Sequence, residues 1–328
     1  MARRLASEPN FCPDIYGNGI RNYCWKLVVN GYRVASASDC YQPCRAESVS
    51  TNRQLDLFVA LIGDVPFRDE REAMSAPLVA LSKNKRTRIE WEGPSGQKVL
   101  VTAPEDTGIA TIWDYDVLLW AVSQINEAVN AGLPVSARIE FHPYNLLKAV
   151  GRNTGGQGYS ELKAALHRLG STSVAYESPS LKSKRRNLGR FNLLSAFKIE
   201  ETDEGQAKAA WLELPLWLFE AVTKDRDILS ISPKYFDLTS GLDRFLYRLA
   251  RRHVGRQAGW IFTFRDLHTR SGSAQPYGQF ARDLRKAIAR NALPEYSMNE
   301  IEGANGPSLA FNRDPSKIEW RQARRYKR

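Results

Sequence analysis

The stretch TSGLDRFLYRLARRHVG, Thr239–Gly255, predicts a long helix and decides how the second half of the chain is interpreted. The elements predicted after it are, in order, a strand at Trp260–Phe264, a short helix at Arg265–Arg270, the turn SGSAQP, a helix at Tyr277–Ala292, and a hairpin of Glu295–Ile301 and Ser308–Asn312. This is the element order of a winged helix, in which the second helix of the helix-turn-helix can enter a DNA major groove.

The same order of elements occurs upstream. The stretch TIWDYDVLLWAVSQINEAVNAGLP, Thr111–Pro134, has apolar residues at steps of three and four and is stopped by its last glycine and proline. The elements predicted around it are a hairpin at Thr87–Glu92 and Lys98–Thr102, then a strand at Arg138–Phe141, a helix from Pro143 to about Gly151, a glycine-rich turn, a helix at Tyr159–Leu169, and strands around Thr172–Tyr176 and Phe191–Ile199. The predicted fold is therefore α+β, with two tandem winged-helix domains.

The predicted division of the chain has four parts. They are a poorly ordered extension at residues 1–52, a tail at 53–76, a first winged-helix domain at 77–224 and a second at 225–328. The apolar run AAWLELPLWLFEAV is expected to pack between the two domains, because its bulky side chains are costly to leave in water. All four cysteines lie in the extension; they are expected to be free thiols, with a zinc site using Cys40 and Cys44 as the alternative.

The charge balance points to a polyanionic partner. The formal net charge is +11 and the isoelectric point is near 9.5. No apolar run approaches the ~20 residues that a membrane span needs, and the N-terminus lacks the apolar region of a secretory signal. The sequence therefore predicts a cytoplasmic protein with no membrane partner.

The helix at Tyr277–Ala292 is the stronger candidate for reading DNA. Its inward stripe is apolar, and another face carries the predicted DNA contacts Gln279, Arg282, Arg285, Lys286 and Arg290. A solvated basic helix face would have the same pattern. The repeated winged-helix order favours DNA contact over that alternative.

The helix at Tyr159–Leu169 is less basic. Its predicted DNA contacts are Tyr159, Ser160, Lys163, His167 and Arg168. The segment SLKSKRRNLGR then supplies a basic run at the expected position of the wing, with Lys182, Lys184, Arg185, Arg186 and Arg190 as predicted phosphate contacts. The alternative is a disordered basic loop.

No pattern indicates an enzyme. GRNTGGQG precedes a helix but lacks the Gly-Lys-Ser/Thr ending that reaches a nucleotide's terminal phosphates, so it is interpreted as a turn. The four histidines are far apart, and the acidic pairs have no neighbours that complete a hydrolytic or metal site. We predict no catalytic residue, metal or cofactor.

From about Arg53 onward the chain resembles the replication initiator protein A family of proteobacterial plasmids. The stretches that carry the resemblance are RQLDLF, GDVPFRDERE, LSKNKRTRIEW, IWDYDVLLWAVSQI, RIEFHPYNLLKAVGRNTGGQGYSELKAALHRL, LPLWLFEAV and YFDLTSGLDRFLYRLARRH. The resemblance implies binding to directly repeated sites in a plasmid origin, opening of the duplex, and recruitment of host proteins such as the initiator and the replicative helicase. A transcriptional repressor is the alternative, and monomer and homodimer both stay open.

The pentapeptide Gln54-Leu55-Asp56-Leu57-Phe58 follows the pattern by which partners of the bacterial polymerase sliding clamp dock on it. The Gln54 amide can be held by hydrogen bonds, while the apolar residues fill a cleft. Affinity on the order of micromolar is expected, because ordering a flexible tail opposes binding. The alternative is that Leu55–Ala60 packs on the protein's own first unit.

Overall fold

The computed structural model describes residues 57–61, 65–74, 76–93, 96–179, 186–203, 207–255 and 257–317. The helices are α1 Asp116–Asn130, α2 Pro143–Ala149, α3 Gly156–Ser171, α4 Leu216–Glu220, α5 Gly241–Val254, α6 Phe264–Ser271 and α7 Tyr277–Arg290. The strands are β1 Leu57–Val59, β2 Arg68–Glu70, β3 Arg88–Glu92, β4 Lys98–Thr102, β5 Arg138–Phe141, β6 Ser173–Pro179, β7 Arg186–Asn192, β8 Ala196–Glu201, β9 Ala207–Glu213, β10 Ile228–Ser230, β11 Gly259–Thr263, β12 Tyr296–Gly303 and β13 Gly306–Arg313. The predicted α+β class is confirmed.

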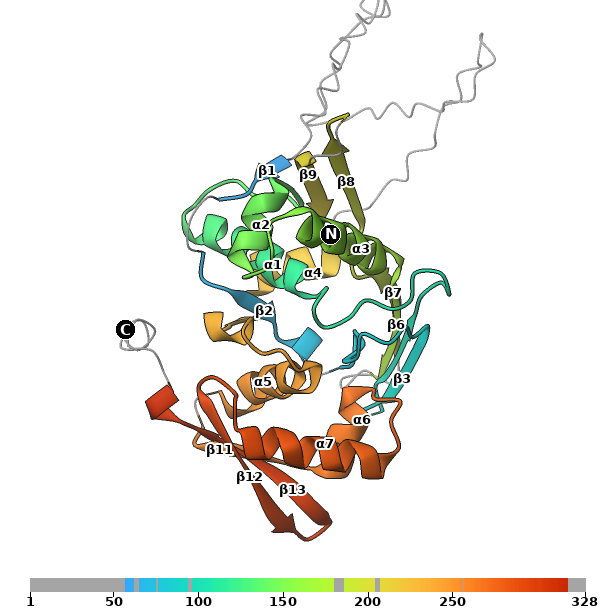
Figure 1. Cartoon of the computed structure of the whole chain (residues 1–328), viewed down its shortest axis with the longest axis vertical. Coiled ribbons are helices and arrows are strands. Elements are labelled where there is room, and N and C mark those ends of the chain that lie inside the picture. The colour runs from blue at the N-terminus through green and yellow to red at the C-terminus, as the bar shows by residue number, and fades with distance from the viewer. Residues whose placement is uncertain are drawn as a thin grey trace, which may run out of the picture. The chain divides into compact units, whose positions relative to one another are not determined.

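The second half of the chain forms a sheet in the order β11-β13-β12, with antiparallel pairing throughout. The helices α5, α6 and α7 precede or interrupt these strands in the predicted order. Figure 1 shows α7 lying alongside the β12–β13 hairpin, and α7 contacts β12 and α5. The C-terminal hairpin therefore lies next to the long basic helix.

The first half repeats this sheet but adds a second hairpin. Strand β5 pairs with β9, and β9 pairs with β8, so the order β5-β9-β8 matches β11-β13-β12. The strand expected at Phe191–Ile199 was wrong: it is divided into β7 and β8 by the buried residues Leu193 and Leu194. Ser195 N–H then donates to Glu213 O as the chain enters the next sheet.

The extra hairpin β6–β7 belongs to a separate sheet in the order β3-β4-β6-β7. This changes the position of the basic segment, which had been expected on the wing. Residues 186–190 lie on β7, an edge strand of this sheet, while the hairpin that matches β12–β13 is β8–β9. A periodic pattern predicts strands but not which strands pair with one another, so the sequence did not indicate that residues 186–190 lie outside the hairpin that matches β12–β13.

The described residues between 57 and 76 contribute to the core, whereas the sequence had predicted a tail there. Strand β1 pairs in parallel with β5, so that Phe58 lies beside Ile139 and is 6% exposed. Strand β2 pairs with β10, and the ring of Phe67 packs against Phe236 at 4.4 Å. Strands of three residues are too short for a period, and their partners are distant in the sequence.

Buried ion pairs link the beginning of α1 to α5. Asp116 accepts hydrogen bonds from Arg244 at 2.7 and 2.9 Å and from Arg152 at 2.9 Å. Asp69 accepts from Arg248 at 2.6 Å and from the Tyr115 hydroxyl at 3.1 Å. A buried charge is costly unless it is paired and hydrogen-bonded, so these partners depend on one another.

One continuous hydrophobic core includes residues of both halves, and all the described residues belong to one compact unit. The predicted boundary between two domains at residues 224 and 225 stays a prediction. In the apolar run between the halves, Leu214 and Leu218 are buried as expected, but Leu216 at the start of α4 is 68% exposed. Within the part of the chain that the structure describes, no helix combines the length and apolarity that a membrane crossing requires.

Candidate nucleic-acid interface

Helix α7 follows α6 after a short turn. Gly272, with φ 59°, ends α6 in the left-handed region, and Asn291, with φ 47°, ends α7. Phe280, Leu284 and Ala287 are buried, as the apolar stripe predicted. The opposite face of α7 is thereby held toward solvent by the core.

The basic side chains of α7 differ in their ion-pair and hydrogen-bond partners. Arg290 pairs with the buried carboxylate of Asp243 on α5 at 2.9 Å, so it ties two helices together. Arg285 pairs with Glu300 on β12 at 2.8 Å. Among the described residues, the hydrogen bonds and ion pairs of Arg282 and Lys286 are formed with side chains of α7.

These own-helix contacts are weak restraints. Lys286 lies 3.4 Å from Asp283 and its side chain is 69% exposed, and Arg282 donates to the Gln279 amide oxygen. Gln279 also donates to Asp283 at 3.3 Å. Exposed pairs of this kind contribute on the order of 0.2–1 kcal/mol, so both cations can turn toward an incoming anion.

The predicted DNA contacts on helix α3 differ in their exposure and in their partners. Ser160 is exposed, and the exposed His167 has its ring against Phe197 of β8 at 5.0 Å. Tyr159 and Lys163 both donate to Glu201, the last residue of β8, at 2.7 Å. These two hydrogen bonds lower the pKa of the Glu201 carboxyl, and Lys163 has the larger effect.

Arg168 has a structural contact that the sequence did not indicate. Its guanidinium donates to both carboxylate oxygens of Asp114, at 2.7 and 2.8 Å, and the Asp114 side chain is 3% exposed. The hydrogen bond to Asp114 raises the pKa of Arg168. This two-pronged pair anchors α3 to the segment just before α1, so Arg168 has a structural role whether or not its other edge meets a phosphate.

The glycine-rich stretch GRNTGGQG was predicted to be a turn, and its first part is one, but α3 begins at Gly156, three residues before the predicted Tyr159. Gly151 has φ 68° and follows α2, and a Cβ at Gly158 would lie 1.7 Å from the Asn153 carbonyl oxygen. Only glycine fits at that approach. The segment therefore sets the angle between α2 and α3.

The remaining predicted residues are only partly described. Arg190 is exposed on β7, and Arg186 begins that strand. Lys182, Lys184 and Arg185, together with Gln54, Leu55 and Asp56, lie outside the described residues, as do the four cysteines. Leu57 begins β1 and Phe58 is buried, which agrees with the alternative that this segment packs on the protein's own first unit.

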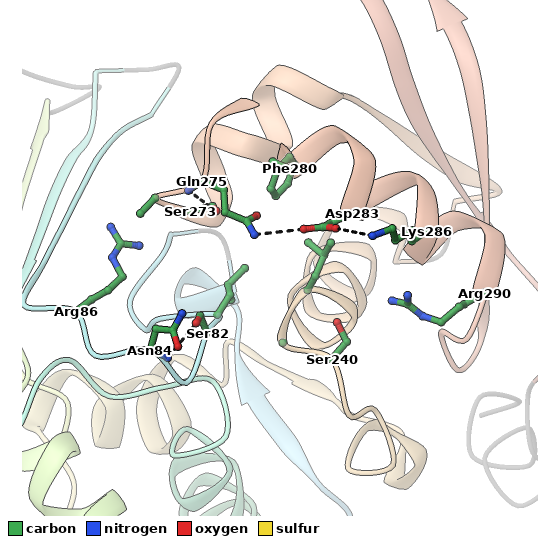
Figure 2. Close-up of a pocket in the computed structure, with 14 residues that line it drawn as sticks. Ser82, Asn84, Arg86, Ser240, Ser273, Gln275, Phe280, Asp283, Lys286 and Arg290 are labelled. Carbon is green, nitrogen blue, oxygen red and sulfur yellow. Dashed lines mark hydrogen bonds and ion pairs between the residues drawn. The ribbon is translucent and has the colours of Figure 1, made fainter. Parts of the chain in front are cut away.

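A cleft of about 520 Å³ separates α7 from the loop that precedes β3. Figure 2 shows Ser82, Asn84 and Arg86 on the loop side, Ser240 at the start of α5, and Lys286 and Arg290 on the α7 side. The spacing of residues in the sequence does not indicate that this loop lies beside α7. Its approach to α7 depends on tertiary packing, because Arg86 donates to the carbonyl of Gly272, which is distant in sequence.

The chain belongs to the replication initiator protein A family, whose model matches residues 68–298. It is 32% identical over 236 residues to a putative replication protein of Wigglesworthia glossinidia brevipalpis, an alignment that covers 71% of this chain and 84% of that relative. The predicted family resemblance is confirmed.

Among solved structures, the chain is similar to domains 2 and 3 of RctB. One crystal structure matches with a TM-score of 0.52 at 15% identity, covering 73% of this chain and 95% of that one. A second structure of the same domains matches with a TM-score of 0.49 at 12% identity, covering 73% and 96%. At 15% identity the first likeness shows a shared fold alone.

Proposed function

We propose that this protein initiates plasmid replication by binding directly repeated origin sites through two winged helices, opening the duplex and recruiting host replication proteins. The repeated sheet orders β5-β9-β8 and β11-β13-β12 support the tandem winged-helix interpretation, because in each half the first strand lies between the first and second of three helices. Membership of the family supports the role in replication. Two recognition helices about one turn apart would give sites of roughly 20 bp.

The observation that carries the proposal is the exposed face of α7. Arg282 and Lys286 lie one turn apart, and the fold does not use either charge to hold another element. The charges of Arg282 and Lys286 are therefore available at this face for phosphates and base edges. On α3, Ser160 is exposed, whereas Lys163 is paired with Glu201 of β8.

Substitution of Lys286 by alanine tests the interface with a matched control. Lys286→Ala should weaken binding to the repeat by at least ~1 kcal/mol. It should also reduce the slope of log affinity against log salt concentration by the amount expected for about one phosphate contact. Lys224 is also 69% exposed and also pairs with an acidic residue of its own helical segment, but it lies outside α7. Lys224→Ala should leave affinity unchanged; equal effects of the two substitutions would contradict the assignment of α7.

Footprinting on the DNA that flanks the gene separates initiation from repression. Direct repeats beside an A/T-rich segment are expected for an initiator. A single palindrome over the promoter would support the alternative of a transcriptional repressor. A tyrosine-linked DNA adduct would instead indicate a nicking enzyme.

Docking of Gln54–Phe58 on the sliding clamp is a further part of the proposal, and it requires β1 to leave β5. Phe58 is 6% exposed in the described fold, so its ring is inaccessible to a partner while the β1 pairing holds. Gln54→Ala should abolish clamp binding and leave affinity for origin DNA intact. Absence of any interaction between the unaltered chain and the clamp would end this part of the proposal.

A further inference from the structure

The guanidinium of Arg86 lies in the cleft beside α7 and is hydrogen-bonded to neutral groups. It donates to the carbonyl oxygens of Gly272 and of Arg88, the latter at 3.2 Å, and both acceptors are neutral. Throughout the described ranges, no carboxylate forms an ion pair with Arg86. The side chain is partly buried, and this burial lowers its pKa. A partly desolvated charge without a counter-charge is unfavourable, and a bound anion would relieve it.

The rest of the cleft is also suited to an anion. Lys286 and Arg290 extend from α7, and Ser82 and Asn84 offer neutral donors from the loop. Asp283 is the one carboxylate that lines the cleft, and it already accepts from Gln275, Gln279 and Lys286. Arg290 is paired with Asp243 and Lys286 with Asp283, so the charge of Arg86 leaves the cleft with a net positive charge.

The position of the cations favours an extended anion over a small one. Figure 2 shows Arg86 and Lys286 on opposite sides of the cleft, with Asn84 on the loop side. A single phosphate would engage one side, whereas successive phosphates of a nucleic-acid strand would engage both. The strand that borders a groove occupied by α7 has this chemistry.

We propose that the cleft between the 82–86 loop and α7 binds the phosphate backbone of one DNA strand, with Arg86 and Lys286 contacting different phosphates. This inference rests on the proposed DNA binding by α7. It adds that a loop of the first half of the chain positions DNA for a helix of the second half. The loop contacts would contribute affinity without sequence preference.

Two substitutions test the loop side of the cleft. Arg86→Ala should lower the salt slope of duplex binding by about one phosphate for every sequence. Asn84→Asp places an anion in the cleft and should weaken binding about 5- to 10-fold, the size expected for one unfavourable phosphate contact. Arg86→Lys keeps the charge and should retain most of the affinity. Thermal unfolding of each variant checks that the fold is preserved, because Arg86 also bonds Gly272.

The matched control is Arg88→Ala. Arg88 lies on the same segment, is exposed, and pairs with Glu90 outside the cleft, so its removal should leave DNA affinity unchanged. If Asn84→Asp and Arg86→Ala bind like the unaltered chain while Lys286→Ala is weakened, the cleft inference is overturned and α7 keeps its role. If none of the three is weakened, the proposed function falls as well.

A titration with ATP and with inorganic phosphate at constant ionic strength separates the sources of phosphate. Neither is expected to displace duplex DNA. Saturable ATP binding that Asn84→Asp abolishes, without an effect on DNA affinity, would assign the cleft to a free nucleotide and overturn the inference.

An independent observation concerns Arg285. Its Nε and Nη2 donate to Glu300 of β12 at 3.0 and 2.8 Å, and its guanidinium lies over the Phe264 ring at 5.2 Å. One edge of the guanidinium is thus fixed by the hairpin, and the Nη1–Nη2 edge keeps its donors for a second partner. In the first half, Glu201 of β8 likewise accepts hydrogen bonds from Tyr159 and Lys163 of α3.

We infer that Arg285 reads a guanine in the major groove and that Glu300 is the positioning residue that orients it. The fork formed by two guanidinium nitrogens matches the O6 and N7 acceptors of guanine. This assignment also depends on α7 entering the groove. It separates Arg285, as a base contact, from Arg282 and Lys286, as phosphate contacts.

Binding to a set of sites that differ at single base pairs tests the assignment. Arg285→Ala and Arg285→Lys should both lose at least ~10-fold of the preference at one position, because lysine lacks the fork. Glu300→Gln should lose part of that preference while binding to unrelated DNA becomes tighter. Uniform weakening over all sequences in Arg285→Ala, with a salt slope lower by about one, would show a phosphate contact and overturn the assignment.

Discussion

Replacement of Asp116 by asparagine should be among the most destabilising conservative changes in the protein. The Asp116 side chain is 1% exposed and receives hydrogen bonds from Arg244 and Arg152. Arg244 is 5% exposed, and its other acceptors are the backbone carbonyls of Leu238 and Phe236. Asparagine leaves the Arg244 charge buried without an opposite charge. Removal of one partner from such a pair costs about 3–5 kcal/mol.

The loss is large against the ~5–15 kcal/mol by which ordinary proteins are stable. Urea unfolding followed by circular dichroism should show a lower midpoint, with a melting temperature roughly 10 °C below that of the unaltered chain. Glu90→Gln is the control, because Glu90 and Arg88 form an exposed pair, at 65% and 59%, that should contribute less than ~1 kcal/mol. A loss below ~1 kcal/mol in Asp116→Asn would refute the reasoning that this network holds α1 to α5.

Phe58→Ala should destabilise the fold by about 3 kcal/mol in urea unfolding, since its buried ring packs in the core; no change would show that β1 is not paired in solution. Arg168→Ala should lower the melting temperature, because it removes the pair with Asp114. Any loss of DNA affinity should be no larger than the loss of folded protein accounts for. A lower salt dependence of DNA binding in a variant whose melting temperature is unchanged would contradict this. The Glu201 carboxyl should titrate below 4.5 by carbon NMR and shift upward in Lys163→Ala. Because its pKa is lowered in the fold, the stabilisation from this contact is present at neutral pH and lost as the pH falls through the folded pKa. A Glu201 pKa that is unchanged in the variant would exclude Lys163 as the cause.

Long periodic elements could be predicted from the sequence, and pairing between distant elements could not. Helix α7 begins at the predicted Tyr277 and ends at Arg290, because Asn291 adopts a left-handed conformation. The short strand β1 was missed because it is defined by its pairing with β5, in which Phe58 lies beside Ile139, a residue distant in the sequence. Local pattern contains no information about that partner.

The cations of the candidate interface show the same limit. Arg168 and Arg290 have the helical spacing expected of DNA contacts, yet each is tied to a buried carboxylate, Asp114 or Asp243. Arg282 has the same kind of spacing and no such partner among the described side chains. The spacing of charges along a helix predicts which face they share. It does not predict which of them form ion pairs with carboxylates elsewhere in the fold.

Phe58 illustrates how a short motif competes with the fold that contains it. Burial of a phenylalanine side chain contributes about 1.5–3 kcal/mol, and this must be given up before the ring can enter a clamp cleft. At ~1.4 kcal/mol for each factor of ten, the apparent clamp affinity falls about 10- to 100-fold below that of the free peptide. A micromolar peptide would then bind only weakly from the closed chain. Clamp docking is therefore expected only where DNA binding, or another partner, releases β1 from β5 or raises the local concentration of the clamp.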